Sequence, residues 1–323
     1  RHSWSCKKRN VMITEPPVKI NLGLNVLRKR EDGYHDLETL FYPCKQIHDT
    51  LEIIKGDDYS RTSARLSALY GDRPKITDLT ASASEEFDAF DDDVMPTFAQ
   101  GISGDGKLMI TVARREGVDW PVTKDLCAKA YHLLDAEFNL PPVKIYLEKT
   151  SPVGAGLGGG SADAAYTLTM LSEMFDLGLS KQQVSEYAAR LGSDCAFFAW
   201  DRPMMGSGRG EILSPYDLNV NIVESSDAAP GSYGLRIVVP EGIEVSTAEA
   251  YRGIKPAVPS VRLEDVLAKP VPEWKDLLVN DFETTVFEAH PELAAIKQSL
   301  YDSGAAYASM SGSGSALFAL YEV

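Results

Sequence analysis

The segment PVGAGLGGGSADAA, residues 152–165, constrains the fold more than any other part of the chain. Five of its fourteen residues are glycine, and it then changes to residues that favour helices. Residues 143–147 just before it alternate as a strand does, so the pattern predicts a strand, a glycine loop and a helix over 161–175. Glycines let backbone N–H groups approach a ligand, and a helix start presents free donors at its positive end. The segment therefore predicts an anion site, and phosphate is the usual guest.

Three phosphate motifs compete for this segment. The P-loop pattern fails, because no lysine precedes Ser161. The dinucleotide fingerprint GxGxxG matches at Gly154, Gly156 and Gly159. It also needs a second parallel strand that ends in an acidic residue, and Asp176, at about the right spacing, is followed by a turn and another helix. The third pattern is a proline, a spacer, Gly-Leu-Gly, small residues and a serine, and it fits residues 152–161 closely.

Length and charge narrow the class of protein. The 323 residues predict two domains, and the formal net charge of −15 disfavours non-specific binding to nucleic acid or to an anionic membrane surface. No apolar run reaches the roughly 18 residues that a membrane span needs. The four cysteines are scattered without zinc-site spacing, which favours a reducing, intracellular setting.

Periodicity predicts mixed helices and strands along the chain. A capping-box spacing at Ser180 and Gln183 begins one helix, which Gly192 ends. The C-terminus reads as strand, glycine loop, strand over residues 306–323. We expect the other strands over 18–27, 37–41, 49–54, 108–113, 197–200 and 235–239, and the other helices over 123–138 and 291–302.

Two segments look different from the rest. Residues 56–106 contain EEFDAFDDD and predict a solvated, partly disordered acidic insertion, with a metal-binding acidic loop as the alternative. Residues 1–11 lack the apolar core of a secretory signal, and we expect them to include upstream sequence or, alternatively, a clipped plastid transit peptide.

Six further motifs carry a family resemblance. They are PVKINLGLNV (17–26), DGYHDLETLF (32–41), LGSDCAFF (191–198), GSGRGE (206–211), NDFE (280–283) and MSGSGSALF (310–318). With the glycine segment they resemble, in the same order, motifs of the GHMP superfamily of small-molecule kinases, which is named for galactokinase, homoserine kinase, mevalonate kinase and phosphomevalonate kinase. Several are similar to one branch of it, whose acceptor alcohol carries cytidine diphosphate.

The resemblance implies a two-domain α+β fold. Residues 12–215 would form an N-terminal, ribosomal-S5-like nucleotide-binding and catalytic domain, and residues 216–323 a ferredoxin-like domain that completes the substrate site. It implies ATP and Mg²⁺, a small-molecule cytidine diphosphate substrate and a cytoplasmic monomer or homodimer, with the plastid as the alternative location. Another kinase of the superfamily, or a non-catalytic nucleotide sensor on the same scaffold, remains open.

The resemblance also assigns roles to residues. Asp194 would be the base that takes the acceptor's proton, Lys19 the cation beside it, and Asn21 a ligand of the polyol. Tyr34 would stack on the cytosine, His35 would bind its edge, and Tyr251 would cover its second face. The residues implied at the nucleotide are Pro152, Gly154, Ala155, Gly156, Leu157, Gly158, Gly159, Gly160, Ser161 and Asp125, with Ser161 also a metal ligand or, on the residues alone, a helix N-cap.

The chain departs from the family pattern at several positions. Ala162 stands where many members have serine, which would remove a hydroxyl near the metal. Asp125 stands where many have asparagine near the adenine, and Ala196 replaces a common proline. The insertion over 56–106 is longer than the family pattern leads us to expect.

Overall fold

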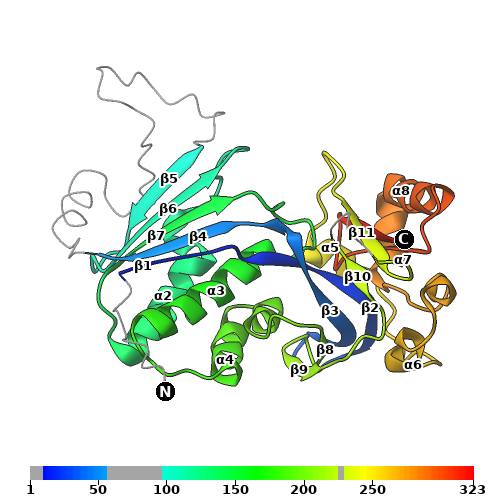
Figure 1. Ribbon diagram of the computed structural model, residues 1–323, viewed down its shortest axis with the longest axis horizontal. Helices are drawn as coiled ribbons and strands as arrows, with labels where there is room; N and C mark the ends of the chain where they lie inside the picture. The colour runs from blue at the N-terminus through cyan, green and yellow to red at the C-terminus, as the bar shows by residue number, and fades with distance from the viewer. Residues whose placement is uncertain (1–9, 57–96, 225–228) are drawn as a thin grey trace. The chain divides into compact units, whose positions relative to one another are not determined.

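The computed structural model describes residues 10–56, 97–224 and 229–323 (Figure 1). Cys6 and the acidic run of residues 85–93 lie outside these residues. The described chain divides into two compact units, each assembled from several segments: unit 1 holds residues 10–16, 48–56, 97–151 and 160–192, and unit 2 holds 17–47, 152–159, 193–224 and 229–323. Because these units interleave along the sequence, the predicted division into 12–215 and 216–323 stays a prediction.

Unit 1 is built on a five-stranded sheet in the order β1-β4-β7-β6-β5. The helices α2 and α3 cover one face of this sheet (Figure 1). β6 and β7 are parallel, whereas the other neighbouring strands pair antiparallel. The elements are β1 (Val11–Thr14), β4 (Thr50–Lys55), β5 (Phe98–Ile102), β6 (Leu108–Arg114), the 3-10 helix η1 (Val122–Lys124), α2 (Leu126–Phe138), β7 (Val143–Lys149), α3 (Gly159–Met174) and α4 (Lys181–Leu191).

Local sequence explains the elements of unit 1. Residues of β7 alternate between buried and more exposed positions, because one face packs on the helices and the other does not. The predicted capping box of α4 is confirmed: Ser180 accepts from the Gln183 backbone N–H, the Gln183 side chain accepts from the Ser180 N–H, and Gly192 follows the last turn.

Unit 2 contains two four-stranded sheets, in the orders β2-β3-β8-β9 and β10-β11-β13-β12. β12 and β13 form the predicted C-terminal hairpin, and the helix α8 has the predicted bounds. The elements are β2 (Pro17–Lys29), β3 (His35–His48), the 3-10 helix η2 (Ser193–Ala199), β8 (Met204–Ser207), β9 (Ile212–Pro215), β10 (Ile222–Val223), β11 (Tyr233–Val238), α5 (Thr247–Tyr251), α6 (Leu263–Leu267), the 3-10 helix η3 (Val271–Trp274), α7 (Phe282–Ala289), α8 (Pro291–Asp302), β12 (Tyr307–Met310) and β13 (Leu317–Glu322).

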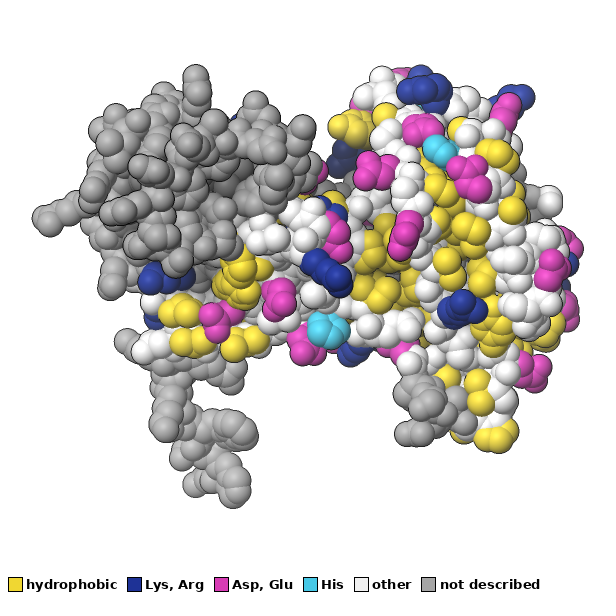
Figure 2. Space-filling model, turned by 90° about the horizontal axis from the view of Figure 1, so that it is seen from above, with side chains coloured by type: hydrophobic (Ala, Val, Ile, Leu, Met, Phe, Trp, Pro, Cys, Tyr) yellow, Lys and Arg dark blue, Asp and Glu magenta, His cyan; other side chains and the backbone are white. Residues whose placement is uncertain are grey.

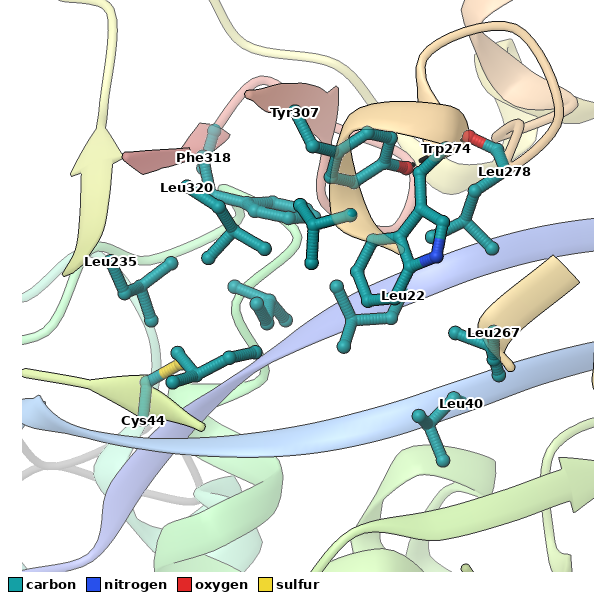
Figure 3. Packing of buried hydrophobic residues seen from close by; sticks show 14 of the residues in the cluster. Leu22, Leu40, Cys44, Leu235, Leu267, Trp274, Leu278, Tyr307, Phe318 and Leu320 are labelled. Carbon is teal, nitrogen blue, oxygen red and sulfur yellow. Dashed lines mark hydrogen bonds between the residues drawn. The ribbon is translucent and has the colours of Figure 1, made fainter. Parts of the chain in front are cut away.

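One hydrophobic cluster joins the two sheets of unit 2 (Figure 3). The Trp274 indole is fully buried and lies edge-on to the Tyr307 ring, which in turn contacts Phe318. Leu22 of β2 and Leu40 of β3 belong to the same cluster. Burying aromatic side chains of this size removes a large apolar area from water, so this cluster fixes β2 against the C-terminal hairpin.

Four sequence predictions need correction. β2 is buried on both faces over its first ten residues, instead of being half-buried. The predicted strand over 197–200 is wrong, because residues 197–199 are the end of η2, a 3-10 helix that begins after the extended Gly192. β5 lies inside the predicted insertion, so that segment is not wholly irregular. Val11 lies in β1 and belongs to the fold.

The described helices, surface charges and cysteines bear on what the composition predicts. None of the described helices is long and apolar enough to cross a membrane. On the face shown in Figure 2, the lysine and arginine side chains stand apart from one another among acidic and hydrophobic side chains. The side chains of Cys44, Cys127 and Cys195 are fully buried.

Candidate active site

The ammonium of Lys19 is the centre of the site. Lys19 lies on β2 and is only 1% exposed. Its Nζ donates to Asn21 Oδ1 at 2.7 Å and to the Gly156 carbonyl at 2.8 Å, and lies 3.4 Å from Asp194 Oδ2. Three acceptors match the three donors of an ammonium. The buried charge is therefore fully coordinated, and its position is fixed.

The glycine loop, residues 152–159, turns its carbonyls toward the body of unit 2. The Ala155 carbonyl accepts from the Ala316 N–H at 3.0 Å, and the Leu157 carbonyl accepts from the Lys19 N–H at 2.9 Å. The Gly156 carbonyl between them accepts from Lys19 Nζ and, at 3.0 Å, from Ser311 Oγ. Within the described residues, no N–H from Val153 to Gly158 donates to another backbone group. The loop therefore keeps a row of amide donors available for an anion.

Two glycines of the loop are required by close packing. A Cβ on Gly156, which has φ of 79°, would lie 2.2 Å from the Ser311 carbonyl oxygen. A Cβ on Gly158, which has φ of 73°, would lie 3.2 Å from Lys19 Cε and 3.3 Å from the Phe198 ring. At Gly156 the positive φ and the lack of space exclude a side chain, and at Gly158 the positive φ and a tight contact disfavour one. These glycines bring the loop against the buried lysine.

A second glycine loop, residues 311–315 between β12 and β13, supports the first. The buried Asn280 side chain holds it, because Nδ2 donates to the carbonyls of Met310 and Gly312 at 2.9 Å each. The Glu283 carboxylate accepts from the Met310 N–H at 2.9 Å. The NDFE motif is thus the support of the C-terminal loop. The sequence shows the NDFE motif itself. The partners of Asn280 and Glu283 are backbone groups about 30 residues away, and no sequence pattern reveals such partners.

Asp194 provides a carboxylate that is both paired and accessible. It is the second residue of η2, and 41% of its side chain is exposed, whereas the side chain of its partner Lys19 is 2% exposed. The turn of the GSGRGE motif closes beside it: a Cβ on Gly210 would lie 3.9 Å from Asp194 Oδ1. The structure therefore brings Lys19 and Asp194 together from distant parts of the chain, as the sequence predicted.

Asn21 is more enclosed than a substrate ligand usually is. It is 2% exposed, its Oδ1 accepts from Lys19, and its Nδ2 donates to Thr39 Oγ1 at 3.0 Å. Thr39 in turn donates to the Gly23 carbonyl. These contacts orient Lys19, and the contact of Asn21 with a polyol stays a prediction.

The three aromatic residues assigned to cytosine lie in unit 2 but do not form an open sandwich. Tyr251 stacks on His35, with ring centroids 4.7 Å apart and planes at 21°. The Tyr34 ring is exposed, and its centroid lies 4.5 Å from the guanidinium carbon of Arg209. Burial, together with the charge of Lys29, lowers the pKa of His35, so its imidazole is neutral near pH 7. Burial also raises the pKa of the Tyr251 phenol, and the Asp194 charge adds to this shift.

Asp125 and Ser161 belong to unit 1. The Asp125 carboxylate caps α2, because Oδ1 accepts from the Cys127 N–H and Oδ2 from Trp120 Nε1, both at 2.8 Å. α3 begins at Gly159, so Ser161 is its third residue and not the N-cap. Ala162, the position of the missing hydroxyl, is fully buried. The adenine contact of Asp125 and the metal contact of Ser161 stay predictions.

Comparisons with known proteins identify the family of the chain. The family models of the GHMP kinases match at both ends of the site: the N-terminal domain over residues 125–202 and the C-terminal domain over residues 263–322. The chain is 42% identical over 310 residues to the 4-diphosphocytidyl-2-C-methyl-D-erythritol kinase of Bacteroides fragilis, covering 96% of this chain and 92% of that one. The enzyme of the same name from Salinibacter ruber is 32% identical over 315 residues, with 95% and 89% covered.

Solved structures give the same result at the level of the fold. A crystal structure of 4-(cytidine 5'-diphospho)-2C-methyl-D-erythritol kinase matches with a TM-score of 0.63 and 27% identity, covering 96% of this chain and 90% of that one. A homoserine kinase from Cytophaga hutchinsonii matches with a TM-score of 0.60 at 14% identity, covering 100% and 88%, which shows a shared fold alone. The chain is a two-domain α+β GHMP kinase, and it belongs to the family of 4-diphosphocytidyl-2-C-methyl-D-erythritol kinases.

Proposed function

We propose that this enzyme transfers the γ-phosphoryl group of ATP to the 2-hydroxyl of 4-diphosphocytidyl-2-C-methyl-D-erythritol, a step in non-mevalonate isoprenoid synthesis. The observation that carries the proposal is the contact of one buried ammonium with two parts of the site. Lys19 Nζ contacts both the Asp194 carboxylate and a carbonyl of the glycine loop. It thereby links a candidate base to a candidate phosphate cradle, which are the two parts that phosphoryl transfer to an alcohol requires.

The carboxylate of Asp194 would accept the proton of the attacking hydroxyl. Its partial exposure leaves room for a substrate oxygen, while its contact with Lys19 holds the carboxylate beside the cation. The Lys19 ammonium would also offset the negative charge that develops as the hydroxyl attacks. The enclosed contacts of Asn21 and Gly156 support this role, because they hold the cation in place before the substrate arrives.

The free amides of residues 153–158 would bind the phosphates of ATP. Among the described residues, no three His, Cys, Asp or Glu side chains come together to cage a metal ion. Mg²⁺ does not need such a cluster, because it commonly binds through substrate phosphates and only one or two protein oxygens. When bound, Mg²⁺ would neutralise charge on the transferred phosphoryl group. The Ser161 hydroxyl, at the start of α3, is the protein ligand that we propose for it.

The cytidine end would be recognised by Tyr34, His35 and Tyr251. A neutral His35 can both donate and accept at a base edge, and an exposed Tyr34 ring offers a face for stacking. Stacking of a base on an aromatic ring contributes about 1–3 kcal/mol. In this structure the Tyr251 ring covers one face of the His35 ring, so a base could stack on that face only after Tyr251 has moved. A monomer or homodimer in the cytoplasm remains our prediction for the state of the protein, with the plastid as the alternative location.

The test is ATP-dependent phosphorylation of the cytidylylated methylerythritol, with mass detection of the phosphorylated product. Homoserine and mevalonate serve as competing acceptors under the same conditions. We expect product only with the cytidylylated alcohol. Equal turnover of the three acceptors would favour another kinase of the superfamily. Binding of ATP and the alcohol without any product would favour a nucleotide sensor.

A further inference from the structure

A second buried lysine lies in unit 1, outside the site described above. Lys149 is the last residue of β7, and its side chain is 4% exposed. Its Nζ donates to Asp49 Oδ2 at 2.5 Å, to Asp163 Oδ2 at 2.8 Å and to Ser151 Oγ at 3.3 Å. Both carboxylates are also almost fully buried. Such a buried group of charges is costly to desolvate, so it calls for a reason beyond stability.

The partners of Lys149 stand at the two ends of the glycine loop. Before the loop, Asp49 Oδ1 accepts from the N–H groups of Thr150 and Ser151 at 2.8 and 2.7 Å, and its Oδ2 accepts from Ser151 Oγ at 2.7 Å. Ser151 is the residue that directly precedes the loop. After the loop, Asp163 is the fifth residue of α3. Lys149 therefore connects the entry of the loop to the helix at its exit, within one compact unit.

The electrostatics of this group agree with a fixed tether. Burial works against the charge of both Lys149 and Asp49. The attraction of Asp163 and then of Asp49 nevertheless raises the pKa of Lys149, and the charge of Lys149 together with hydrogen bonds from Lys149 and Ser151 lowers the pKa of Asp49. Burial raises the pKa of Asp163 well above its ordinary value. Among the described residues, Asp163 Oδ1 is a buried oxygen without a hydrogen-bond partner. One ammonium thus balances the Asp49 carboxylate, while Asp163 serves as an acceptor held in the helix.

The loop needs such a tether because of its composition. Four of the eight residues from Pro152 to Gly159 are glycine, and glycine loses more conformational freedom on ordering than any other residue. Amides that must all face one ligand gain affinity when their segment is ordered beforehand. Fixing the two ends restricts the conformations that the residues between them can reach.

We propose that Lys149 is a positioning residue for the nucleotide: by joining Asp49 to Asp163 it holds both ends of the phosphate-binding loop, so that the loop amides are ordered before a nucleoside triphosphate binds. The inference rests on the proposed function, since it concerns the same loop. It assigns Lys149 no contact with the reacting atoms. It predicts that the loss of Lys149 acts on nucleotide binding more than on the alcohol.

The experiment compares Lys149→Met and Asp49→Asn with the control Lys107→Met. Lys107 also lies in unit 1 and pairs with a carboxylate, Asp135, but neither Asp135 nor its other side-chain partner, Asn139, belongs to the loop or its ends. The affinity for the non-hydrolysable analogue AMP-PNP is measured by calorimetry, at a temperature where thermal melting shows each variant folded. The KM values for ATP and for the alcohol are measured with the same preparations.

We expect Lys149→Met and Asp49→Asn to weaken AMP-PNP binding and to raise the KM for ATP by roughly tenfold or more, since small misplacements of binding groups have effects of this order. The KM for the alcohol should stay within about twofold, and Lys107→Met should bind like the wild type. If Lys149→Met does not fold, Asp49→Asn decides the question, because it keeps Lys149 and its contact with Asp163 but changes the group that accepts from the Thr150 and Ser151 N–H groups.

Unchanged AMP-PNP affinity in both test variants overturns the inference, as does an equal loss in Lys107→Met. A wild type that binds AMP-PNP but does not phosphorylate the cytidylylated alcohol refutes the proposed substrate and leaves the binding comparison readable. A wild type that binds no nucleotide overturns both proposals.

Discussion

Two buried lysines, Lys19 in unit 2 and Lys149 in unit 1, have similar burial but different partners. Lys19 contacts two neutral oxygens and one carboxylate, Asp194, whose side chain is 41% exposed. Lys149 contacts two carboxylates that are at most 2% exposed. A buried cation with an accessible counter-ion can act on a substrate directly, whereas a cation enclosed by buried carboxyl groups can act only through the protein groups that it holds in place. The difference lies in the exposure of the acid and not in that of the lysine.

The largest effect expected from this comparison is on Asp194→Asn. The amide cannot accept a proton, so we expect kcat to fall by about 10²–10⁴-fold, the usual range for a general base. The affinity for ATP and the stability should change little, because this side chain is partly exposed. Turnover measured beside calorimetric ATP binding checks both statements. A variant with near-normal kcat would remove Asp194 from the mechanism and with it the contrast between the two lysines.

The next effect concerns the loop that contacts Lys19. In Gly156→Ala the new Cβ would lie 2.2 Å from a backbone oxygen, at positive φ, so we expect the free energy of unfolding to fall by about 2 kcal/mol or more. Gly154→Ala is the matched control, because its φ is also positive, at 71°, but no atom lies within 4 Å of the new Cβ. We expect it to lose about 1–2 kcal/mol from backbone strain alone. Urea unfolding measures both, and equal losses would contradict the close packing at Gly156.

A smaller effect is expected from Asn280→Ala. This change leaves the Met310 and Gly312 carbonyls without their shared donor, which should cost about 1–3 kcal/mol in the free energy of unfolding. Because the 311–315 loop donates to the Gly156 carbonyl through Ser311, the KM for ATP should also rise. Chemical unfolding and initial-rate kinetics measure the two effects. Full stability in this variant would show that the loop does not depend on Asn280.

The smallest effect concerns Asp163→Asn and pH. Since burial raises the pKa of Asp163 in the folded state above the ordinary 3.8, its contribution to stability is fully present below that value and is lost as pH rises through the raised pKa. Asparagine does not ionise, so the variant should gain stability relative to the wild type as pH increases above about 4. It keeps an acceptor for Lys149, and we expect turnover to change little.

Urea unfolding at a series of pH values tests this. Asp49 has the opposite sign: the Lys149 charge and the hydrogen bonds from Lys149 and Ser151 together outweigh burial and lower its pKa, so its contribution is present above the ordinary value and is lost on acidification. A parallel pH dependence of Asp163→Asn and the wild type would mean that Asp163 is ionised in the folded protein.

Local patterns in the sequence predicted much of this architecture. The capping box at Ser180, the bounds of α8 and the C-terminal hairpin depend on neighbouring residues, and all three are confirmed. The approach of Lys19 to Asp194 is a long-range fact, and only the family resemblance made it predictable. The strand predicted from the apolar run at Phe197 was wrong, because two buried phenylalanines suit a 3-10 helix as well as a strand.

Long-range partners were the part that the sequence did not reveal. The sequence alone would place a lysine such as Lys149, at the end of an alternating strand, in solvent. Its two carboxyl partners, Asp49 and Asp163, lie in other segments of the sequence. The role of Asn280 depends on carbonyl groups, and every residue type has those. Burial of a charged side chain is decided by the tertiary structure, and periodicity carries no record of it.

The three inward carbonyls of residues 155–157 determine where their neighbouring amides point. A peptide unit is planar and trans, so the C=O of one residue and the N–H of the next point in opposite directions. Each hydrogen bond that turns a carbonyl of Ala155, Gly156 or Leu157 inward therefore turns the N–H of the following residue outward. Lys19 holds two of these planes, one through its Nζ and one through its own backbone N–H. A substitution at Lys19 would thus remove one of the two contacts by which it orients the phosphate donors, as well as a charge, while the backbone contact would remain.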